Sequence, residues 1–355
     1  ISTRYPFPIF GGDKLRAFGI LKFLSKKNKV DLVCLGKKNQ LFKNKLAFCN
    51  NIKVFHSHFL IRILNILFSF LQFQPLQNGY YLSKEMKNYI DSVQDKYDTI
   101  ICHLLRSSQY LPDNFSKKTI LDSTDLLSLN YEQSIKKLSI FNPLKYIYII
   151  EKILVQRYEE KTFRKFNCIV FVSNKDAIKA KKKVLKKNKI IVIGNTKSIN
   201  PKIFSYKKNN NKIIFIGNIK YLPNRLACND FAKNILKKIN YKYPDIQFHI
   251  IGDIGYINKF ILNKYKNVIV HGKVKELKNI LKNSICGLCN VEIATGFQNK
   301  ILSYMSFGIP TVIRTNPNIE KKFKNGKEVL LSKNTDELKN KIIQLKKNKK
   351  LANKL

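Results

Sequence analysis

Arginine is scarce in this sequence: of the 67 basic residues in the 355-residue chain, 8 are arginine and 59 are lysine. Arginine is the side chain best suited to bidentate contacts with phosphates and base edges. Its scarcity therefore argues against a nucleic-acid-binding protein, despite a formal net charge of +44. The lysines are also scattered along every segment rather than gathered into one basic stripe. We attribute the charge to a compositional bias toward lysine, asparagine and isoleucine, and we expect attraction to an anionic membrane only as a secondary consequence.

Internal repeats, low-complexity tracts and long apolar runs are missing as well, which indicates an ordinary globular protein. The most apolar segment, residues 59–73, contains Arg62, Asn65 and Gln72 and is too short to span a bilayer. We expect it to form a half-buried or membrane-touching helix. The chain exceeds the roughly 250 to 300 residues at which single cores stop growing, which predicts two domains. Residues 1–3 have the character of a strand already under way, so we expect a few N-terminal residues to be missing.

No second cysteine pair accompanies Cys286 and Cys289, the one pair at metal or redox spacing. A zinc site needs further ligands, and a redox pair needs a strand-to-helix turn before a helix. These two cysteines instead lie within an apolar run, residues 284–291, that indicates a buried strand. His56 and His58 likewise have no third ligand in view. We therefore expect reduced, buried thiols in a cytoplasmic protein, and no metal.

Short apolar runs alternate with longer helical patterns, which is typical of parallel sheets with crossover helices. Near residues 198–211 the pattern lapses into a lysine- and asparagine-rich composition typical of a solvated linker. We predict an N-terminal Rossmann-like domain over residues 1–195, a linker over 196–211 and a C-terminal Rossmann-like domain over 212–355. The expected fold class is thus α/β, with two doubly wound parallel-sheet domains facing a cleft. Helices are predicted at 14–25, 84–94, 144–166, from 223 onward and at 297–307, and strands at 30–35, 99–103, 118–121, 168–172, 212–216, 247–251, 267–270, 285–290 and 311–313.

Residues 286–310 form the most informative segment, in which a buried strand is followed by a glycine-containing loop and an amphipathic helix. The N-terminus of such a helix has unpaired N–H groups and the positive end of the helix dipole, so it can hold a diphosphate without a metal. Gly296 would let the backbone approach the ligand closely, and Lys300 would bring a cation to the first turn. An ordinary helix that starts after a glycine is the alternative interpretation.

The run Gly296-Phe-Gln-Asn-Lys-Ile-Leu-Ser-Tyr-Met305 resembles the donor-site helix of group 1 glycosyltransferases (family four, GT-B fold), where a Gly-x-Gln-Asn-Lys-x-Leu-Glu-x-Met pattern recurs. The resemblance implies a nucleotide-diphosphate-sugar donor, a glycan or glycolipid acceptor, retention of configuration and no required cofactor. Further segments similar to the family follow in its order: 5–16, 215–218, 222–224, 248–252 and 270–274.

Together the pattern and the resemblance predict a set of donor-binding residues. Backbone donors after two strands of the second domain would face the diphosphate and the base, and Lys220 would add charge. The alternative interpretation is that the glycines form ordinary turns and the lysines are basic side chains on the surface. The predicted donor-binding residues are Gly12, Gly217, Asn218, Lys220, Gly272, Val274, Gly296, Phe297, Gln298, Asn299, Lys300 and Ser303.

The family's Glu-x7-Glu motif is absent, because its two positions are occupied by Thr295 and Ser303. Ser303 can still bind a ribose hydroxyl, but without the charge assistance of a carboxylate. Glu292 is close enough in sequence to substitute for the first glutamate, and a solvated loop position is the alternative. This departure leaves open an inactive nucleotide-sugar-binding or scaffold protein.

In the first domain, two candidate catalytic residues lie where strands end. His103 ends the strand 99–103 at its carboxyl edge, where ligands bind in such sheets, and could act as an acid or base or bind sugar hydroxyls. Asp122 follows the next strand and could orient an acceptor hydroxyl. The alternatives are a structural histidine and a helix-capping aspartate.

The resulting prediction is a glycosyltransferase of cell-surface polysaccharide or glycolipid biosynthesis. Its expected location is the cytoplasm, at the inner face of an anionic membrane. The rival interpretations are an inactive nucleotide-sugar-binding protein and a basic nucleic-acid-binding protein. The second rival lacks any recognition motif, so no nucleic-acid partner is expected.

Overall fold

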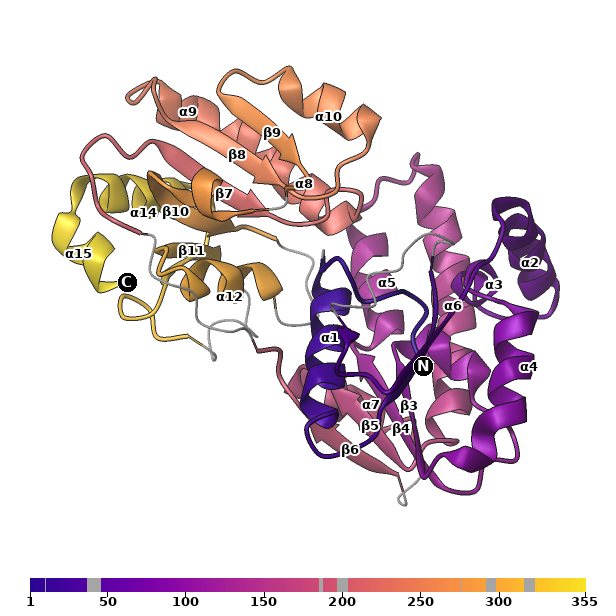
Figure 1. The fold of residues 1–355 in the computed structure, drawn as a ribbon. Helices are drawn as coiled ribbons and strands as arrows, with labels where there is room; N and C mark the ends of the chain where they lie inside the picture. The colour runs from indigo at the N-terminus through magenta and orange to yellow at the C-terminus, as the bar shows by residue number, and fades with distance from the viewer. Residues whose placement is uncertain are drawn as a thin grey trace. The chain divides into compact units, whose positions relative to one another are not determined.

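The computed structural model describes residues 1–9, 11–36, 46–184, 188–196, 204–274, 276–291, 298–315 and 323–355. The chain divides into two compact units, Ile1–Asn195 and Thr196–Leu355. Each unit is built on a parallel sheet with crossover helices, which confirms the predicted α/β class with two parallel-sheet domains (Figure 1).

The described residues of the N-terminal unit, drawn from indigo to rose in Figure 1, form the strands β1 to β6. Its elements are α1 (Gly12–Leu24), β1 (Asp31–Leu35), β2 (Asn51–Phe55), α2 (Phe59–Leu71), α3 (Leu76–Tyr80), α4 (Lys84–Val93), η2 (Gln94–Lys96), β3 (Thr99–His103), η3 (Leu105–Tyr110), β4 (Lys118–Thr124), α5 (Leu127–Lys137), α6 (Pro143–Phe163), β5 (Cys168–Phe171), α7 (Asn174–Lys181) and β6 (Lys189–Val192).

Ser2 joins the two parts of this unit's sheet. It forms parallel bridges to Cys34 in β1 and to His103 in β3. Its N–H donates to the Val33 carbonyl at 3.0 Å. The order is therefore β2-β1-Ser2-β3-β4-β5-β6, with every pairing parallel. Counted along the chain this is the 3-2-1-4-5-6 order of dinucleotide-binding sheets with one further strand, and the strand character predicted for residues 1–3 is confirmed.

The helices cover both faces of this sheet, because alternate residues of β1 point to opposite sides. Leu32 and Cys34 pack in one cluster with Phe18 of α1. Val33 and Leu35 pack in another with Met86 and Ile90 of α4. Two separate apolar clusters on one strand are what a doubly wound sheet requires.

The C-terminal unit has a sheet in the order β9-β8-β7-β10-β11-β12, all parallel. This is again the 3-2-1-4-5-6 order. Its elements are β7 (Lys212–Ile216), α8 (Leu222–Asp230), η4 (Phe231–Leu236), α9 (Lys237–Asn240), β8 (Gln247–Ile251), α10 (Tyr256–Asn263), β9 (Val268–Gly272), α11 (Lys278–Leu281), β10 (Ser284–Cys289), α12 (Asn299–Ser306), β11 (Thr311–Arg314), β12 (Leu330–Ser332), α14 (Thr335–Lys347) and α15 (Lys349–Lys354).

The predicted buried strand that carries the paired cysteines is confirmed as β10, whose six residues are all buried. Burial raises the pKa of both thiols, Cys286 and Cys289. All seven cysteines are free. No helix of the described residues is long and apolar enough to cross a membrane.

Candidate functional site

The strand order of the C-terminal unit places its switch point between β7 and β10, which are neighbours whose following connections diverge. Ligands of open α/β sheets bind at the carboxyl ends of the strands at this point. Gly217 and Asn218 directly follow β7, and the chain after β10 leads into α12. Gly296 and Phe297, like Glu292 and Thr295, lie outside the described residues.

Three glycines pack backbone against backbone where β7, β8 and β9 end. The Gly217 N–H donates to the Ile251 carbonyl at 2.9 Å, and the Gly252 N–H donates to the Gly272 carbonyl at 2.8 Å. A Cβ atom added to Gly252 would lie 1.9 Å from the Gly217 carbonyl oxygen. The predicted positions Gly217 and Gly272 thus lie at one strand edge, with Gly252 as a third member that was not predicted.

Lys300 is buried at the start of α12, with 6% of its surface exposed. Its ammonium group donates to Asn224 Oδ1 at 2.7 Å. It also lies 4.0 Å from the centre of the Phe215 ring. Burial lowers the pKa of Lys300. No carboxylate among the described residues pairs with it, so this cation is only partly compensated, a situation that an anionic ligand would relieve.

Tyr304 fixes α12 to the ends of both switch-point strands. Its hydroxyl accepts from the Ile216 N–H of β7 at 2.8 Å and donates to the Leu288 carbonyl of β10 at 3.1 Å. The ring occupies the space beside Gly287, where an added Cβ would lie 2.2 Å from it. This tyrosine was not predicted, although a glycine inside a fully buried strand is the sequence signal of such a close approach.

The other predicted donor residues are held by local contacts. Asn218 accepts from the Lys220 N–H at 3.0 Å through its side chain and from Asn224 Nδ2 at 2.9 Å through its carbonyl. Lys220 and Lys273 both pair with Asp253, at 3.1 and 2.9 Å. Burial alone would raise the pKa of Asp253, but the two lysines lower it overall. Asp253 was not predicted, and it shows that Lys220 already has an anionic partner.

The remaining predicted residues lie on or near α12 and β9. Gln298 is the extended residue before α12, and Asn299 is its first residue. The Ser303 hydroxyl donates to the Asn299 carbonyl one turn earlier, at 3.1 Å, and the residue is 8% exposed. Val274 packs against the core of the unit. The hydroxyl at the family's glutamate position is therefore turned toward its own helix backbone.

In the N-terminal unit, Asp122 joins the predicted His103 to Arg16 of α1. Arg16 donates to both carboxylate oxygens, at 2.7 and 2.9 Å. His103 Nδ1 lies 2.8 Å from Asp122 Oδ2, and its Nε2 lies 3.0 Å from the Asp13 carbonyl. Burial alone would raise the pKa of Asp122, but the hydrogen bonds from His103 and Arg16 lower it overall. Gly12 is the first residue of α1, which carries both Asp13 and Arg16.

A second arginine, Arg106, lies at the same strand edge. Arg106, in η3 after β3, donates from Nε to the Thr3 hydroxyl at 2.9 Å. Its guanidinium lies 4.5 Å from the centre of the Tyr81 ring, whose hydroxyl accepts from Arg4 at 2.6 Å. Burial lowers the pKa of Arg106. Within the described residues no carboxylate pairs with it, which leaves a surplus positive charge at the switch point of this sheet.

His249 and His271 form a pair in the sheet of the C-terminal unit, and protonation of this pair lowers the stability of the unit. His249 Nδ1 lies 2.9 Å from His271 Nε2, and His249 Nε2 lies 3.1 Å from Gln247 Oε1. Burial, His271 and Lys212 lower the pKa of His249 to about 4, below the ordinary value of 6.5. Protonation therefore favours the unfolded chain, and the pair's contribution to stability is present above pH 6.5 and is lost as the pH falls toward 4.

We expect the melting temperature of the C-terminal unit to fall over this pH range and His249→Gln to flatten that fall. Differential scanning calorimetry at several pH values measures both slopes. A variant whose slope equals that of the wild type would contradict the assignment.

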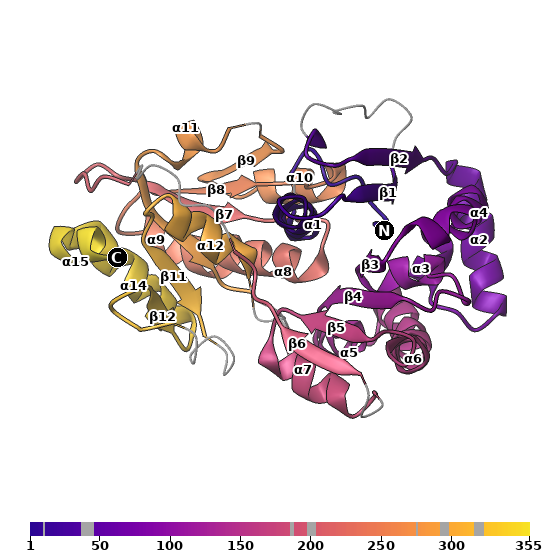
Figure 2. The same ribbon diagram turned by 60° about the horizontal axis from the view of Figure 1, so that its bottom comes forward.

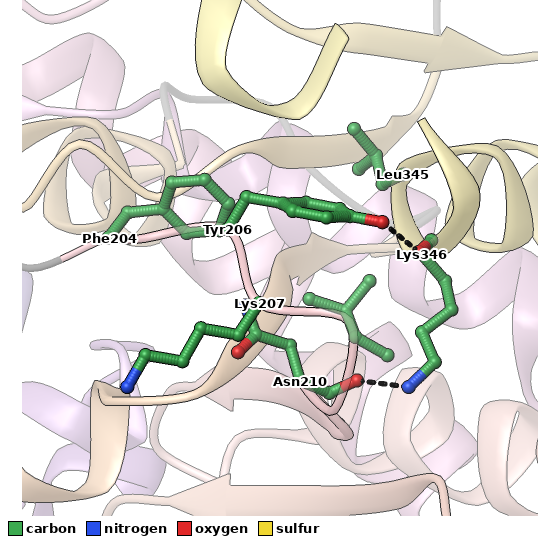
Figure 3. A pocket seen from close by; sticks show the side chains of 7 residues that line it. Phe204, Tyr206, Lys207, Asn210, Leu345 and Lys346 are labelled. Atoms are coloured by element: carbon green, nitrogen blue, oxygen red, sulfur yellow. Dashed lines mark hydrogen bonds between the residues drawn. The ribbon is translucent and has the colours of Figure 1, made fainter. Parts of the chain in front are cut away.

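One small hollow lies away from the switch point. It is lined by Phe204, Tyr206, Lys207, Asn210, Ile285, Leu345 and Lys346 (Figure 3). The Tyr206 hydroxyl donates to the Lys346 carbonyl at 2.9 Å, and Lys346 Nζ donates to the Asn210 carbonyl at 2.6 Å (Figure 3). These bonds tie residues 204–210 to α14 at the amino end of β10, which indicates a structural role.

Comparisons with known proteins give one family match and several similar folds. Residues 210–348 match the family model described as glycosyl transferases group 1. No curated protein sequence matches the chain. Among solved structures, HepE from Anabaena in complex with UDP-glucose is 12% identical, with a TM-score of 0.68, 99% of this chain covered and 91% of that one. Sucrose-phosphate synthase from Thermosynechococcus elongatus is 12% identical, with a TM-score of 0.69 and coverages of 99% and 91%.

A third similar structure is the lipopolysaccharide outer core galactosyltransferase WaaB, which is 15% identical, with a TM-score of 0.55 and coverages of 97% and 89%. At such identities the likeness shows the fold, and the family match lies over the unit that holds Lys300. The chain therefore has the GT-B fold of these glycosyltransferases, and residues 210–348 of its C-terminal unit are similar to the group 1 glycosyl transferases.

Proposed function

We propose that this chain transfers a sugar, with retention of configuration, from a UDP-sugar to an acceptor hydroxyl in cell-surface polysaccharide or glycolipid biosynthesis. The solved complex of HepE with UDP-glucose supports the choice of donor. The likeness to a lipopolysaccharide galactosyltransferase supports the choice of acceptor class. The proposed location is the cytoplasmic face of an anionic membrane.

The observation that carries the donor site is the buried, incompletely compensated Lys300 at the switch point. During transfer, negative charge develops on the leaving diphosphate. Backbone N–H groups at the start of α12 and the Lys300 ammonium would stabilise that charge, and they are fixed before the reaction begins by Tyr304 and Asn224. Gly217 and Gly272 would let the backbone approach the nucleotide at the same strand edge.

Replacing Lys300 by methionine is expected to weaken UDP binding by about 1–3 kcal/mol, the range for a charge-assisted hydrogen bond. Thermal stability should stay level or rise, because the variant removes a buried cation that has no carboxylate partner among the described residues. Isothermal titration with UDP and UDP-glucose, together with melting curves, measures both effects.

The matched control is Lys220→Met, because the Lys220 side chain is 56% exposed and already pairs with Asp253. We expect the control to change UDP binding less than Lys300→Met does. If Lys300→Met leaves the UDP affinity unchanged, whatever its melting temperature, Lys300 belongs to the core and not to the donor site.

For the acceptor, we propose that the carboxyl edge of β3 binds the hydroxyl-bearing group. His103 Nε2 would exchange the Asp13 carbonyl for a sugar hydroxyl, while Asp122 holds the other ring nitrogen. Both carboxylate oxygens of Asp122 are engaged by Arg16 and His103, so Asp122 acts in this proposal as a positioning residue. The surplus positive charge of Arg106 favours an acceptor that carries a phosphate or carboxylate.

A second candidate is an inactive nucleotide-sugar-binding protein, which the inward-turned Ser303 hydroxyl favours. Both candidates bind the donor, so binding alone does not distinguish them. Release of UDP from UDP-sugars in the presence and absence of glycolipid acceptors does. Tight UDP binding without hydrolysis or transfer across a panel of sugars would favour the inactive protein.

A further inference from the structure

Helix α2 is inverted relative to the rule for surface helices, which bury an apolar stripe and expose a polar one. Its least exposed positions recur at helical spacing and are Arg62, Asn65, Ile66 and Ser69, three of them polar. Its exposed positions are apolar: Leu60 is 73% exposed and Leu64 is 64% exposed. The helix therefore presents its apolar face outward.

Close polar packing holds α2 in this orientation. A Cβ atom added to Gly79 of α3 would lie 2.3 Å from the Asn65 carbonyl oxygen and 2.6 Å from the Ser69 hydroxyl. The Arg62 guanidinium lies 5.1 Å from the centre of the Tyr80 ring. The inward stripe thus fits α3 closely, and a rotation of α2 that buried its leucines would break these contacts.

The first half of α6 shows the same arrangement. Glu151 is buried and accepts from the Leu76 N–H at 2.8 Å and from the Gln77 N–H at 3.2 Å, at the start of α3. Ile147 and Ile150, close to it along the helix, are 46% and 41% exposed. An acidic side chain faces the protein here, and isoleucines face outward.

The two outward faces belong to one region of the N-terminal unit, since α3 lies between α2 and α6 (Figures 1 and 2). Of thirty large apolar side chains that the described part of the chain exposes, eighteen lie within residues 59–73 and 140–153. We call these side chains the α2–α6 surface. Apolar exposure on this scale marks an interaction site in a water-soluble protein.

The charge around the surface identifies its partner. The sequence has no aspartate or glutamate from residue 32 to 84 or from 133 to 150. The second stretch carries Lys136, which pairs with Glu132 at 3.3 Å, and also Lys137 and Lys145. Apolar side chains with a net basic surround match an anionic bilayer, where the apolar groups enter the acyl boundary and the lysines meet the headgroups. Since no described helix can span a membrane, α2 would lie in the plane of the interface.

We propose that the α2–α6 surface seats the N-terminal unit on an anionic lipid bilayer. This proposal deepens the proposed function and rests on it in one respect: membrane binding would give access to a glycolipid acceptor. The side chains of the α2–α6 surface take no part in donor binding. Failure of the membrane proposal can therefore be told apart from failure of the transferase proposal.

The test uses the full chain in co-sedimentation with vesicles of phosphatidylcholine alone or of phosphatidylcholine mixed equally with phosphatidylglycerol. We expect the wild type to bind the anionic vesicles at least about tenfold more tightly, and high salt to reduce this difference. Leu64→Glu/Leu67→Glu and, independently, Ile147→Glu/Ile150→Glu should each lose at least about tenfold in affinity. All four side chains are exposed, so melting temperatures should be unchanged.

The matched control is Tyr256→Glu/Ile257→Glu on α10 of the other unit, where the two side chains are 93% and 77% exposed. It should bind vesicles like the wild type. Equal binding of the wild type to both vesicles overturns the proposal, as does wild-type affinity in both paired variants. If the wild type does not bind vesicles and is a dimer, and the paired variants are monomers, the surface binds a second copy of the chain instead. UDP titration of every variant should match the wild type, whatever the vesicle result.

Discussion

Asp122→Ala is expected to destabilise the N-terminal unit by about 3–5 kcal/mol, the cost of removing one partner from a buried ion pair. Arg16 and Asp122 side chains are only 7% and 3% exposed, so water cannot replace the lost carboxylate. His103 would lose its Nδ1 partner in the same variant. Native-state hydrogen exchange of the β3 and β4 amides measures the loss in this unit alone, which avoids assuming two-state unfolding of a two-unit chain.

The sign of the pH dependence follows from the lowered pKa of Asp122. Its contribution is present above the unfolded value of 3.8 and is lost as the pH falls through the lower folded value. The difference in stability between the wild type and Asp122→Ala should therefore shrink only in strong acid.

Arg16→Met/Asp122→Ala should cost less than the sum of the single changes, because neither charge is left alone. Asp91→Ala, which breaks an exposed pair with Lys87 at 3.9 Å, should cost under about 1 kcal/mol. Equal losses in the two aspartate variants would contradict the buried pair.

Gly252→Ala is expected to destabilise the C-terminal unit by about 3 kcal/mol or more and to weaken UDP binding as well. Gly252 has φ of 141°, and the new methyl group would lie 1.9 Å from the Gly217 carbonyl oxygen. Backbone cannot move aside as a flexible side chain can, so the loop after β7 must shift. Melting curves and UDP titration measure the two effects.

Gly272→Ala is the matched control at the same strand edge. Its φ is 72°, but nothing lies within 4 Å of the added Cβ. Only the strain of the left-handed backbone remains, about 1–2 kcal/mol. Equal destabilisation by the two substitutions would show that the close approach of Gly217 and Gly252 does not constrain the fold.

The central strands could be predicted from the sequence with accurate bounds. The predicted bounds of β3, β7 and β8 are confirmed without a shift, because each of these strands contains at least three apolar residues. The strands that were not predicted, β2, β6 and β12, all lie at the edges of their sheets. β2 and β6 have no fully buried residue, so their sequences carry little apolar signal.

The site could be predicted less completely, because its contacts join residues that are far apart in the chain. The start of the helix near Lys300 could be predicted, because a buried strand, a glycine-containing loop and a helix pattern follow one another in the sequence. Its partner Asn224, 76 residues away, could not, since only the tertiary fold brings these two side chains together. The exposure of the apolar face of α2 could not be predicted either. The sequence of α2 predicts an apolar face, but it does not predict that α3 packs against the polar face instead.

The place of Ser2 in the sheet has a consequence for synthesis of the chain. The centre of the N-terminal sheet is occupied by its first residues, whose two neighbours are β1 and, about a hundred positions later, β3. At a ribosomal rate of about 5–20 residues per second, the first strand waits on the order of 5–20 s for its second neighbour. Meanwhile the edge of Ser2 that later pairs with β3 has no neighbouring strand. Pairing between residues so far apart in the sequence delays closure of this sheet.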